Sequence, residues 1–297
     1  MKQGLFFSST LVLAKSLSDL DMPFIQILIL AAIQGITEFL PISSSGHLIL
    51  IPKLTGLADQ GLMMDVAVHV GTLVAVMLYF WRDVFGMVRS LARIFRQIEN
   101  HRKFDAEFWL FCKLLLATLP AIVVGFYVNK YMGVNLRTLE IIGWATLCFG
   151  ILLFVADKIN MTVRKMEHIS FGGAFFVGLM QAIALVPGTS RAGITMTAAR
   201  FLGVERQDAA RFSLLLSIPA IIGAGVLKGY ELSGSTDKML IYDVLTVAGL
   251  SFLFALVAIS LLMLWLRRAS FTPFVIYRIL LGGVLLCIVY RGSIFGF

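Results

Sequence analysis

The sequence predicts an all-α polytopic membrane protein with six transmembrane helices, two re-entrant helix-break-helix segments and inverted repeats. Of its 297 residues, 59% are hydrophobic and 14% are charged, whereas charged residues make up about 25% of an average soluble domain. Six apolar runs approach the ~20 residues that a spanning helix needs. Two further apolar segments are broken by Pro and Gly, which is typical of folds built from inverted repeats. Basic cytoplasmic loops explain the net charge of +8, so we expect no nucleic-acid partner.

The chain begins with a segment outside this pattern. In residues 1–22 an apolar patch precedes a polar run, which indicates either a cleavable signal or a disordered, dispensable extension. Residues 23–292 are predicted to form one integral membrane domain made of two inverted repeats, about 23–157 and 170–292. The predicted spans are 64–81, 108–127, 139–156, 212–229, 243–266 and 274–290.

Two apolar runs, 47–54 and 171–186, are too short or too interrupted to span and are predicted to be re-entrant. Broken backbone at membrane depth survives only where it is buried in protein or lines a cavity. Each half of the chain then holds one re-entrant pair and three spans, and because three is odd, the second half enters from the opposite side. A shift of 147 residues aligns Gln34 with Gln181, Ile36 with Ile183, Ser43 with Ser190 and Gly46 with Gly193.

The Lys and Arg residues between the apolar runs are unevenly divided. Fourteen fall on the side of the loops 82–107, 158–170, 200–211 and 267–268, and six fall on the other side. An excess of basic residues marks the cytoplasmic side of a membrane protein. We therefore expect these loops in the cytoplasm and both termini outside.

The stretch from Gln34 to His47 is the first candidate site. A charged group at bilayer depth costs ~2.5–3.5 kcal/mol even on a lenient insertion scale, so it usually marks function. Glu38 is the one carboxylate of its apolar run, and Gln34, four residues earlier, shares its helix face. Because Mg²⁺ takes one or two carboxylates plus phosphate oxygens, Glu38 with Gln34 is predicted to bind metal. The structural alternative is a Glu that accepts hydrogen bonds from the amides of the broken helix.

Three consecutive hydroxyls, Ser43, Ser44 and Ser45, stand where a new half-helix begins. Ser is among the best N-caps, so at least one of them is expected only to cap. The same helix start presents free amide hydrogens, which bind anions, so Ser43 and Ser45, with Gln34 of the preceding helix, are expected to bind substrate. His47 lies within reach of that pocket. His69 has no polar neighbours in the middle of its apolar run and is expected to be an ordinary core residue.

Arg191 is the main candidate in the second copy, because its guanidinium cannot be neutralised and its planar donors suit phosphate. The structural alternative is a pair between Arg191 and Glu38. Two other basic residues near predicted span ends, Lys113 and Arg278, are expected to extend toward the membrane interface. The residues expected to bind substrate beside Arg191 are Ser190 and Thr195 through their hydroxyls, and Gly188 and Gly193 through close backbone approach.

These motifs resemble those of the bacterial undecaprenyl-diphosphate phosphatases, also called bacitracin-resistance proteins. The resemblance rests on Gln-x-x-x-Glu ending at Glu38, Pro-x-Ser-Ser-x-Gly-His ending at His47, and Pro-Gly-x-Ser-Arg-x-Gly ending at Gly193. It covers about residues 25–292 and includes the run Ser-Phe-Thr-Pro-Phe-Val-Ile-Tyr-Arg that ends at Arg278. Gln34 stands where many relatives have Glu, so cation binding depends more heavily on Glu38.

The resemblance implies hydrolysis of undecaprenyl diphosphate to undecaprenyl phosphate and inorganic phosphate, which recycles the lipid carrier of peptidoglycan and envelope glycans and confers bacitracin resistance. It implies a Mg²⁺ or Ca²⁺ cofactor, a polyprenyl diphosphate substrate among membrane lipids, and a multi-pass protein of the bacterial plasma (inner) membrane with its site facing the periplasm or outside. A homodimer is left open beside a monomer. Motif by motif, the resemblance places Gln34, Glu38, Ser43, Ser44, His47, Ser190, Arg191 and Thr195 in the site.

In the expected mechanism Arg191, the metal on Glu38 and the half-helix amides bind the diphosphate and spread the transition-state charge. Ser44 is the preferred nucleophile with His47 as its general acid and base. Direct attack by His47 or by metal-activated water is the alternative. A different class, a transporter or flippase of a lipid phosphate or other anion, shares the plan of broken helices. The acid and the His stand in one copy and the Arg in the other, which favours a fixed catalytic site.

Overall fold

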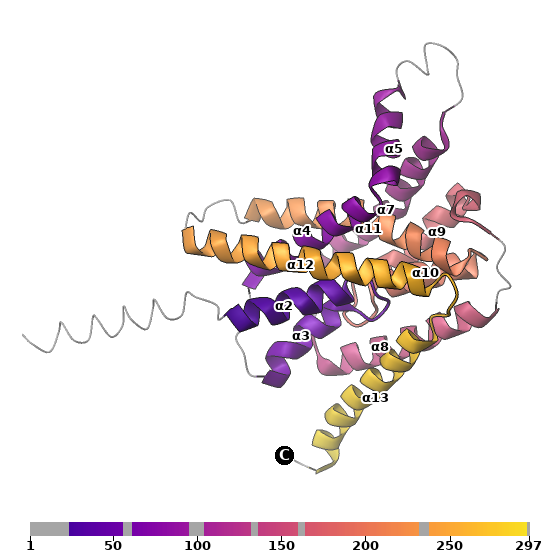
Figure 1. The fold of residues 1–297 in the computed structure, drawn as a ribbon. Helices are drawn as coiled ribbons and strands as arrows, with labels where there is room; N and C mark the ends of the chain where they lie inside the picture. The colour runs from indigo at the N-terminus through magenta and orange to yellow at the C-terminus, as the bar shows by residue number, and fades with distance from the viewer. Residues whose placement is uncertain are drawn as a thin grey trace, which may run out of the picture.

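Helices make up almost the whole of the described structure (Figure 1). The computed structural model describes residues 24–55, 61–94, 104–131, 136–159, 164–231 and 238–295. The predicted N-terminal extension, 1–22, lies outside them. The first half contains α2 (Phe24–Thr37), α3 (Ser44–Thr55), α4 (Gly61–Tyr79), α5 (Trp81–Ala92), α7 (Ala106–Tyr131) and α8 (Leu139–Ile159). The second contains η1 (Met166–His168), α9 (Phe171–Ile183), α10 (Arg191–Phe201), α11 (Arg206–Glu231), α12 (Lys238–Trp265) and α13 (Thr272–Phe295).

Five of the described helices, α7, α8, α11, α12 and α13, are long and apolar enough to cross a membrane, and the bent pair α4 and α5 makes a sixth if it is one span. Each falls on one of the six predicted spans. Large apolar side chains such as Leu261, Leu264 and Leu280 are exposed on the outside of the bundle, which is the surface that lipid covers in a membrane protein. The prediction of an all-α polytopic membrane protein is confirmed.

The segment that follows α4 differs from the prediction of a loop over 82–107. The chain turns by 84° after Tyr79 and continues as α5. The reason is an amphipathic pattern that continues past the predicted span: Met87 is buried, while Arg82 and Arg89 are exposed. An ion pair between Asp83 and Arg211 joins α5 to α11.

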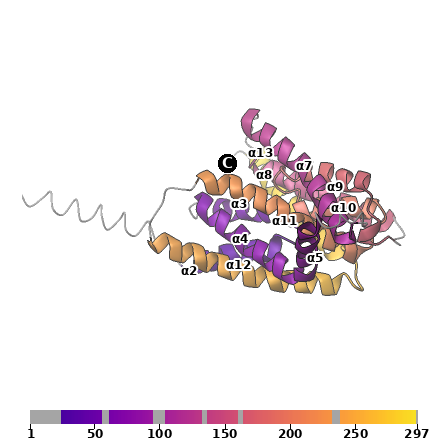
Figure 2. The same cartoon turned by 90° about the horizontal axis from the view of Figure 1, so that it is seen from above.

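The packing of the two halves follows the repeat found in the sequence. The shift of 147 residues places α2 on α9, α3 on α10 and α4 on α11. In space α2 packs along α12, and its counterpart α9 packs along α7. Figure 2 shows α4 between α11 and α12, both of which it contacts. The last helices of the two halves, α8 and α13, pack against each other.

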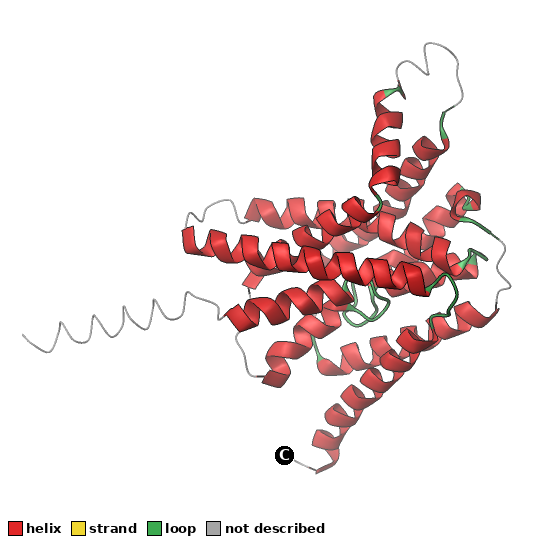
Figure 3. Cartoon of the chain, in the orientation of Figure 1, coloured by secondary structure: helices red, strands yellow, loops and turns green. Residues whose placement is uncertain are grey.

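The turns that break the two re-entrant segments lie in the middle of the molecule, where Figure 3 shows non-helical chain surrounded by helices. Directly after the second turn comes α10, in which every residue from Ala192 to Arg200 is buried. Most of these side chains are small or carry a single hydroxyl, so the helix can be enclosed by α8, α9 and α11. This enclosure holds α10, and with it the turn that precedes it, in a fixed position.

Candidate active site

Both re-entrant turns end in a serine with the same unusual backbone. Ser43 has φ 76° and Ser190 has φ 70°, and they are the non-glycine residues of the described chain with positive φ. Such a conformation is costly for a residue with a Cβ and persists only where its surroundings hold it. The Ser43 Oγ accepts from the Gly46 amide at 3.3 Å, and the Ser190 Oγ accepts from the Gly193 amide at 3.0 Å. The two breaks therefore have the same turn conformation, with Ser43 and Ser190 as N-caps of the helices that follow.

Glu38, directly after α2, connects the two turns. Its side chain is 6% exposed. One carboxylate oxygen accepts from Arg191 Nη2 at 2.8 Å. The other accepts from Gln34 Nε2 at 2.9 Å and from Ser44 Oγ at 2.6 Å. Glu38 and Arg191 thus form the ion pair that the structural alternative proposed, and this pair lies at the wall of a cavity.

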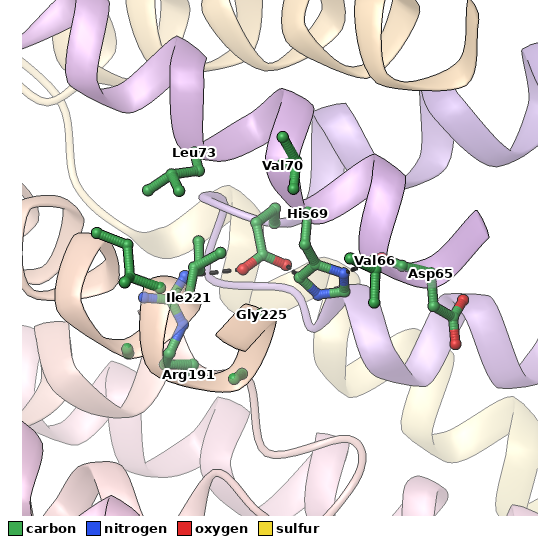
Figure 4. Close-up of a pocket in the computed structure, with 12 residues that line it drawn as sticks. Asp65, Val66, His69, Val70, Leu73, Arg191, Ile221 and Gly225 are labelled. Carbon is green, nitrogen blue, oxygen red and sulfur yellow. Dashed lines mark hydrogen bonds and ion pairs between the residues drawn. The ribbon is translucent and has the colours of Figure 1, made fainter. Parts of the chain in front are cut away.

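This cavity, of about 430 Å³, opens between α4 and α11. Figure 4 shows Arg191 and His69 extending into it from opposite sides. Its charged or polar lining consists of Glu38, Asp65, His69 and Arg191. The rest of the lining is apolar or glycine: Val66, Val70 and Leu73 of α4, and Ala220, Ile221, Ile222, Ala224 and Gly225 of α11. A polar end bordered by apolar helices suits an anionic group attached to a hydrocarbon chain.

Arg278 does not extend to the membrane interface as predicted. It is fully buried, and its guanidinium donates only to backbone carbonyls in its hydrogen bonds within the described chain. It reaches the first turn at Pro41 (3.2 Å), and the second at Gly188 (3.1 Å) and Thr189 (2.8 Å). The partners explain the burial, because the turns expose carbonyls that their own broken helices leave unpaired. Arg278 therefore fixes the two turns relative to each other.

The predicted glycines make room for this arrangement. A Cβ on Gly193 would lie 2.7 Å from Arg278 Nη1, and a Cβ on Gly188, whose φ is +93°, would lie 2.6 Å from the carbonyl oxygen of Ile142. Their close contacts are thus with Arg278 and α8. Thr195 is buried as well, and its hydroxyl donates to the Arg191 carbonyl at 2.8 Å. Thr195 thus contacts Arg191, and direct contact with substrate stays a prediction for Thr195 and the two glycines.

Ser44 and His47 are neighbours on α3 but do not pair with each other. Ser44 donates to Glu38, as described. His47 Nδ1 lies 2.7 Å from the Ser43 carbonyl, and its Nε2 lies 2.5 Å from the hydroxyl of Tyr277, whose ring stacks on the imidazole. Ser45 is exposed, with its Oγ 3.4 Å from Ser43 Oγ. The structure thus makes Glu38, and not His47, the acceptor of the Ser44 hydroxyl.

His69, expected to be an ordinary core residue, lies in the cavity instead. Its Nε2 is 3.9 Å from Glu38 Oε2. The sequence did contain a signal for this position, because Asp65 and His69 are four residues apart and so share one face of an apolar helix.

A metal ion would find few protein ligands here. Among the described residues no group of three or more His, Cys, Asp or Glu side chains is arranged to hold one. The buried Oε1 of Gln34 has no hydrogen-bond partner, which fits an additional ligand at this point. Gln181 Oε1 has no hydrogen-bond partner either, so the feature that distinguishes the first turn is the adjacent carboxylate of Glu38. The carboxylate of Glu38 and the amide oxygen of Gln34 are oxygen ligands of the kind that a hard cation takes together with phosphate oxygens.

The fold and the site define a polytopic membrane protein with a cavity whose polar end, Glu38 and Arg191, lies where two re-entrant turns meet. The family model of the bacitracin resistance protein BacA matches residues 27–284, and the chain belongs to this family.

Similar proteins cover almost the whole chain. An undecaprenyl-diphosphatase of Jannaschia sp. (strain CCS1) is 48% identical over 271 residues, which are 91% of this chain and 100% of the relative. The protein of the same name from Dinoroseobacter shibae has the same identity and coverage. That of Alteromonas mediterranea is 44% identical over 269 residues, with 91% and 100% covered.

Proposed function

We propose that this protein is an undecaprenyl-diphosphate phosphatase, which hydrolyses undecaprenyl diphosphate to undecaprenyl phosphate and inorganic phosphate. The observation that carries the proposal is the cavity in which Arg191 and Glu38 form a polar end between apolar helices. A lipid diphosphate has the same division into anionic head and hydrocarbon tail. The names of the relatives support the assignment, and hydrolysis of this lipid accounts for the bacitracin resistance in the family's name.

The residues of the two turns have separate tasks in this reaction. Arg191 uses one guanidinium nitrogen on Glu38, so its other N–H groups are available for phosphate oxygens. The start of α3 adds amide hydrogens and the positive end of the helix dipole. Preorganised donors of this kind stabilise the charge that develops on the transferred phosphoryl group.

Ser44 is the nucleophile in the proposed first step. Its Oγ forms a bond to the terminal phosphorus, while the bond from that phosphorus to the bridging oxygen breaks and undecaprenyl phosphate leaves with the electron pair. The hydroxyl proton passes to Glu38 Oε2, which already accepts it in a 2.6 Å hydrogen bond. Water then attacks the phosphorus of the phosphoryl-serine, the bond from phosphorus to Ser44 Oγ breaks, Oγ takes back the proton held by Glu38, and the water oxygen leaves as part of inorganic phosphate.

Rapid acid quenching during turnover is expected to trap a phosphoryl-enzyme that is stable in acid, and Ser44→Ala is expected to trap none. Labelled substrate and gel analysis measure it. A Ser260→Ala variant, which removes an exposed hydroxyl of α12 outside the cavity, is the matched control and should trap the parental amount. An acid-labile adduct that disappears in His47→Ala would transfer the role to His47. Full activity of Ser44→Ala would exclude the covalent step through Ser44.

We also propose a divalent cation, Mg²⁺ or Ca²⁺, bound by Glu38 and by Gln34 Oε1 together with diphosphate oxygens of the substrate. Such a cation supplies Lewis-acid stabilisation of the phosphoryl oxygens. Support comes from the carboxylate beside the unpartnered amide oxygen. A chelator is expected to stop phosphate release, and either metal to restore it.

The protein spans a membrane several times, and we propose the bacterial plasma membrane with the site open to the outer side. The distribution of basic loops supports this orientation. Gln97→Cys and Ser235→Cys, each in a chain without Cys112, Cys148 and Cys287, compare the two sides. A membrane-impermeant thiol reagent on intact cells should label the second and spare the first. Labelling of the first alone would reverse the orientation.

Phosphate release by the purified protein in detergent tests the proposed function against transport. A detergent micelle does not separate two compartments, so transport produces no measurable change in this assay. A hydrolase still releases phosphate from undecaprenyl diphosphate in detergent. The absence of release from a folded, metal-loaded protein would favour the transporter or flippase alternative.

A further inference from the structure

The cavity contains one imidazole that the proposed reaction does not use, His69 of α4. It extends into the cavity opposite Arg191 (Figure 4). Its side chain is 36% exposed, compared with 6% for that of Glu38. A bound molecule that touches Glu38 and Arg191 would therefore also meet His69.

The orientation of the imidazole is fixed by a backbone contact. Nδ1 lies 2.6 Å from the Asp65 carbonyl oxygen, which can only accept, so Nδ1 carries a hydrogen. Nε2 then faces the cavity. Within the described chain its polar neighbour is Glu38 Oε2 at 3.9 Å, which is too far for a hydrogen bond. His47 differs, because the Ser43 carbonyl and the Tyr277 hydroxyl contact both of its ring nitrogens.

The cavity leaves few side-chain partners for a diphosphate. Arg191 and Glu38 largely offset each other at 2.8 Å, and Gln34 and Ser44 already donate to Glu38. A diphosphate brings several negative charges and many acceptor oxygens. Among the described residues that line the cavity, the polar groups left for it are the further N–H groups of Arg191 and the Nε2 of His69, with the carboxylate of Asp65 near the imidazole.

We propose that His69 is a substrate-binding residue whose Nε2 forms a hydrogen bond with the diphosphate of the lipid. Nδ1–H stays on the Asp65 carbonyl, so the ring keeps the orientation that presents Nε2 to the cavity. The diphosphate lies between Arg191 and His69, and His69 transfers no proton. This inference rests on the proposed function, which supplies the diphosphate.

Two substitutions separate binding from proton transfer. His69→Gln keeps a side chain that can form a hydrogen bond at a similar distance from α4, whereas His69→Leu keeps the bulk and loses the hydrogen bond. With undecaprenyl diphosphate in detergent, His69→Leu is expected to raise KM about tenfold, the effect of one hydrogen bond to a charged group. Its kcat, and both constants of His69→Gln, are expected to stay within about threefold of the parent. His168→Leu, which removes an imidazole of η1 outside the cavity, is the matched control and should behave as the parent.

A binding measurement with inorganic diphosphate does not require turnover. A ligand of the folded state raises the thermal unfolding midpoint, and we expect inorganic diphosphate to do so for the parent and His69→Gln but much less for His69→Leu. Parental binding by His69→Leu would overturn the proposal. So would a loss of kcat at unchanged KM that is equal in both variants, because it would assign proton transfer to His69. A His69-dependent shift in a parent that releases no phosphate from the lipid would refute the proposed function and leave the binding site in place.

Discussion

Glu38→Gln is expected to lower kcat for phosphate release by about a thousandfold or more, the upper range for loss of one preorganised electrostatic contact. The substitution removes the carboxylate that accepts from Arg191, Gln34 and Ser44, the proposed base for Ser44 and the charged ligand for the cation. The amide keeps the volume and can still accept from Arg191, so the fold should persist. Phosphate release at saturating Mg²⁺ measures the effect.

Glu107→Gln is the matched control for this prediction, because Glu107 is an exposed acid at the start of α7 and outside the cavity. It should keep the parental rate. Gel filtration and the thermal unfolding midpoint check that Glu38→Gln is folded. A folded Glu38→Gln protein with near-parental phosphate release would refute both roles of this carboxylate.

Arg191→Lys is expected to lose activity nearly as severely as Arg191→Ala, by about a hundredfold or more. The reason is geometry. Arg191 contacts Glu38 with one nitrogen and has further N–H groups for phosphate, whereas a Lys ammonium is a point charge without that planar arrangement. Steady-state kinetics of the two variants and the parent provide the comparison.

A conservative change on an exposed arginine controls for the general effect of replacing Arg by Lys. Arg89 of α5 is exposed, and Arg89→Lys should keep the parental rate. If Arg191→Lys recovers a large part of the parental rate while Arg191→Ala does not, charge alone is sufficient and the forked contact with phosphate is refuted.

The features predictable from the sequence are those fixed by local chemistry. The Pro, Ser and Gly residues of the two breaks repeat at a constant spacing, and they form the same turn with Ser43 and Ser190 as caps. Apolar runs of the right length gave the spans. Burial of a charge in an apolar run pointed to Glu38 and Arg191, which the structure places 2.8 Å apart.

The features that were missed depend on partners far away in the sequence. Arg278 looked like an interfacial residue, because its partners are carbonyls of Pro41, Gly188 and Thr189 that no side-chain pattern reveals. His69 was expected to have no polar neighbours, because its proximity to Glu38 exists only in the folded structure. Ser44 and His47 were predicted to pair because they are close in the sequence. In the structure the Ser44 hydroxyl donates to Glu38, in the turn before α3, and the imidazole of His47 contacts Tyr277 of α13.

The most direct test of the account follows both products of undecaprenyl diphosphate labelled in its terminal phosphate. The purified protein in detergent is expected to convert each lipid molecule into one unlabelled undecaprenyl phosphate and one labelled inorganic phosphate. Intact lipid after incubation with folded, metal-loaded protein, or release of inorganic diphosphate with an alcohol lipid, would contradict hydrolysis at the terminal phosphorus.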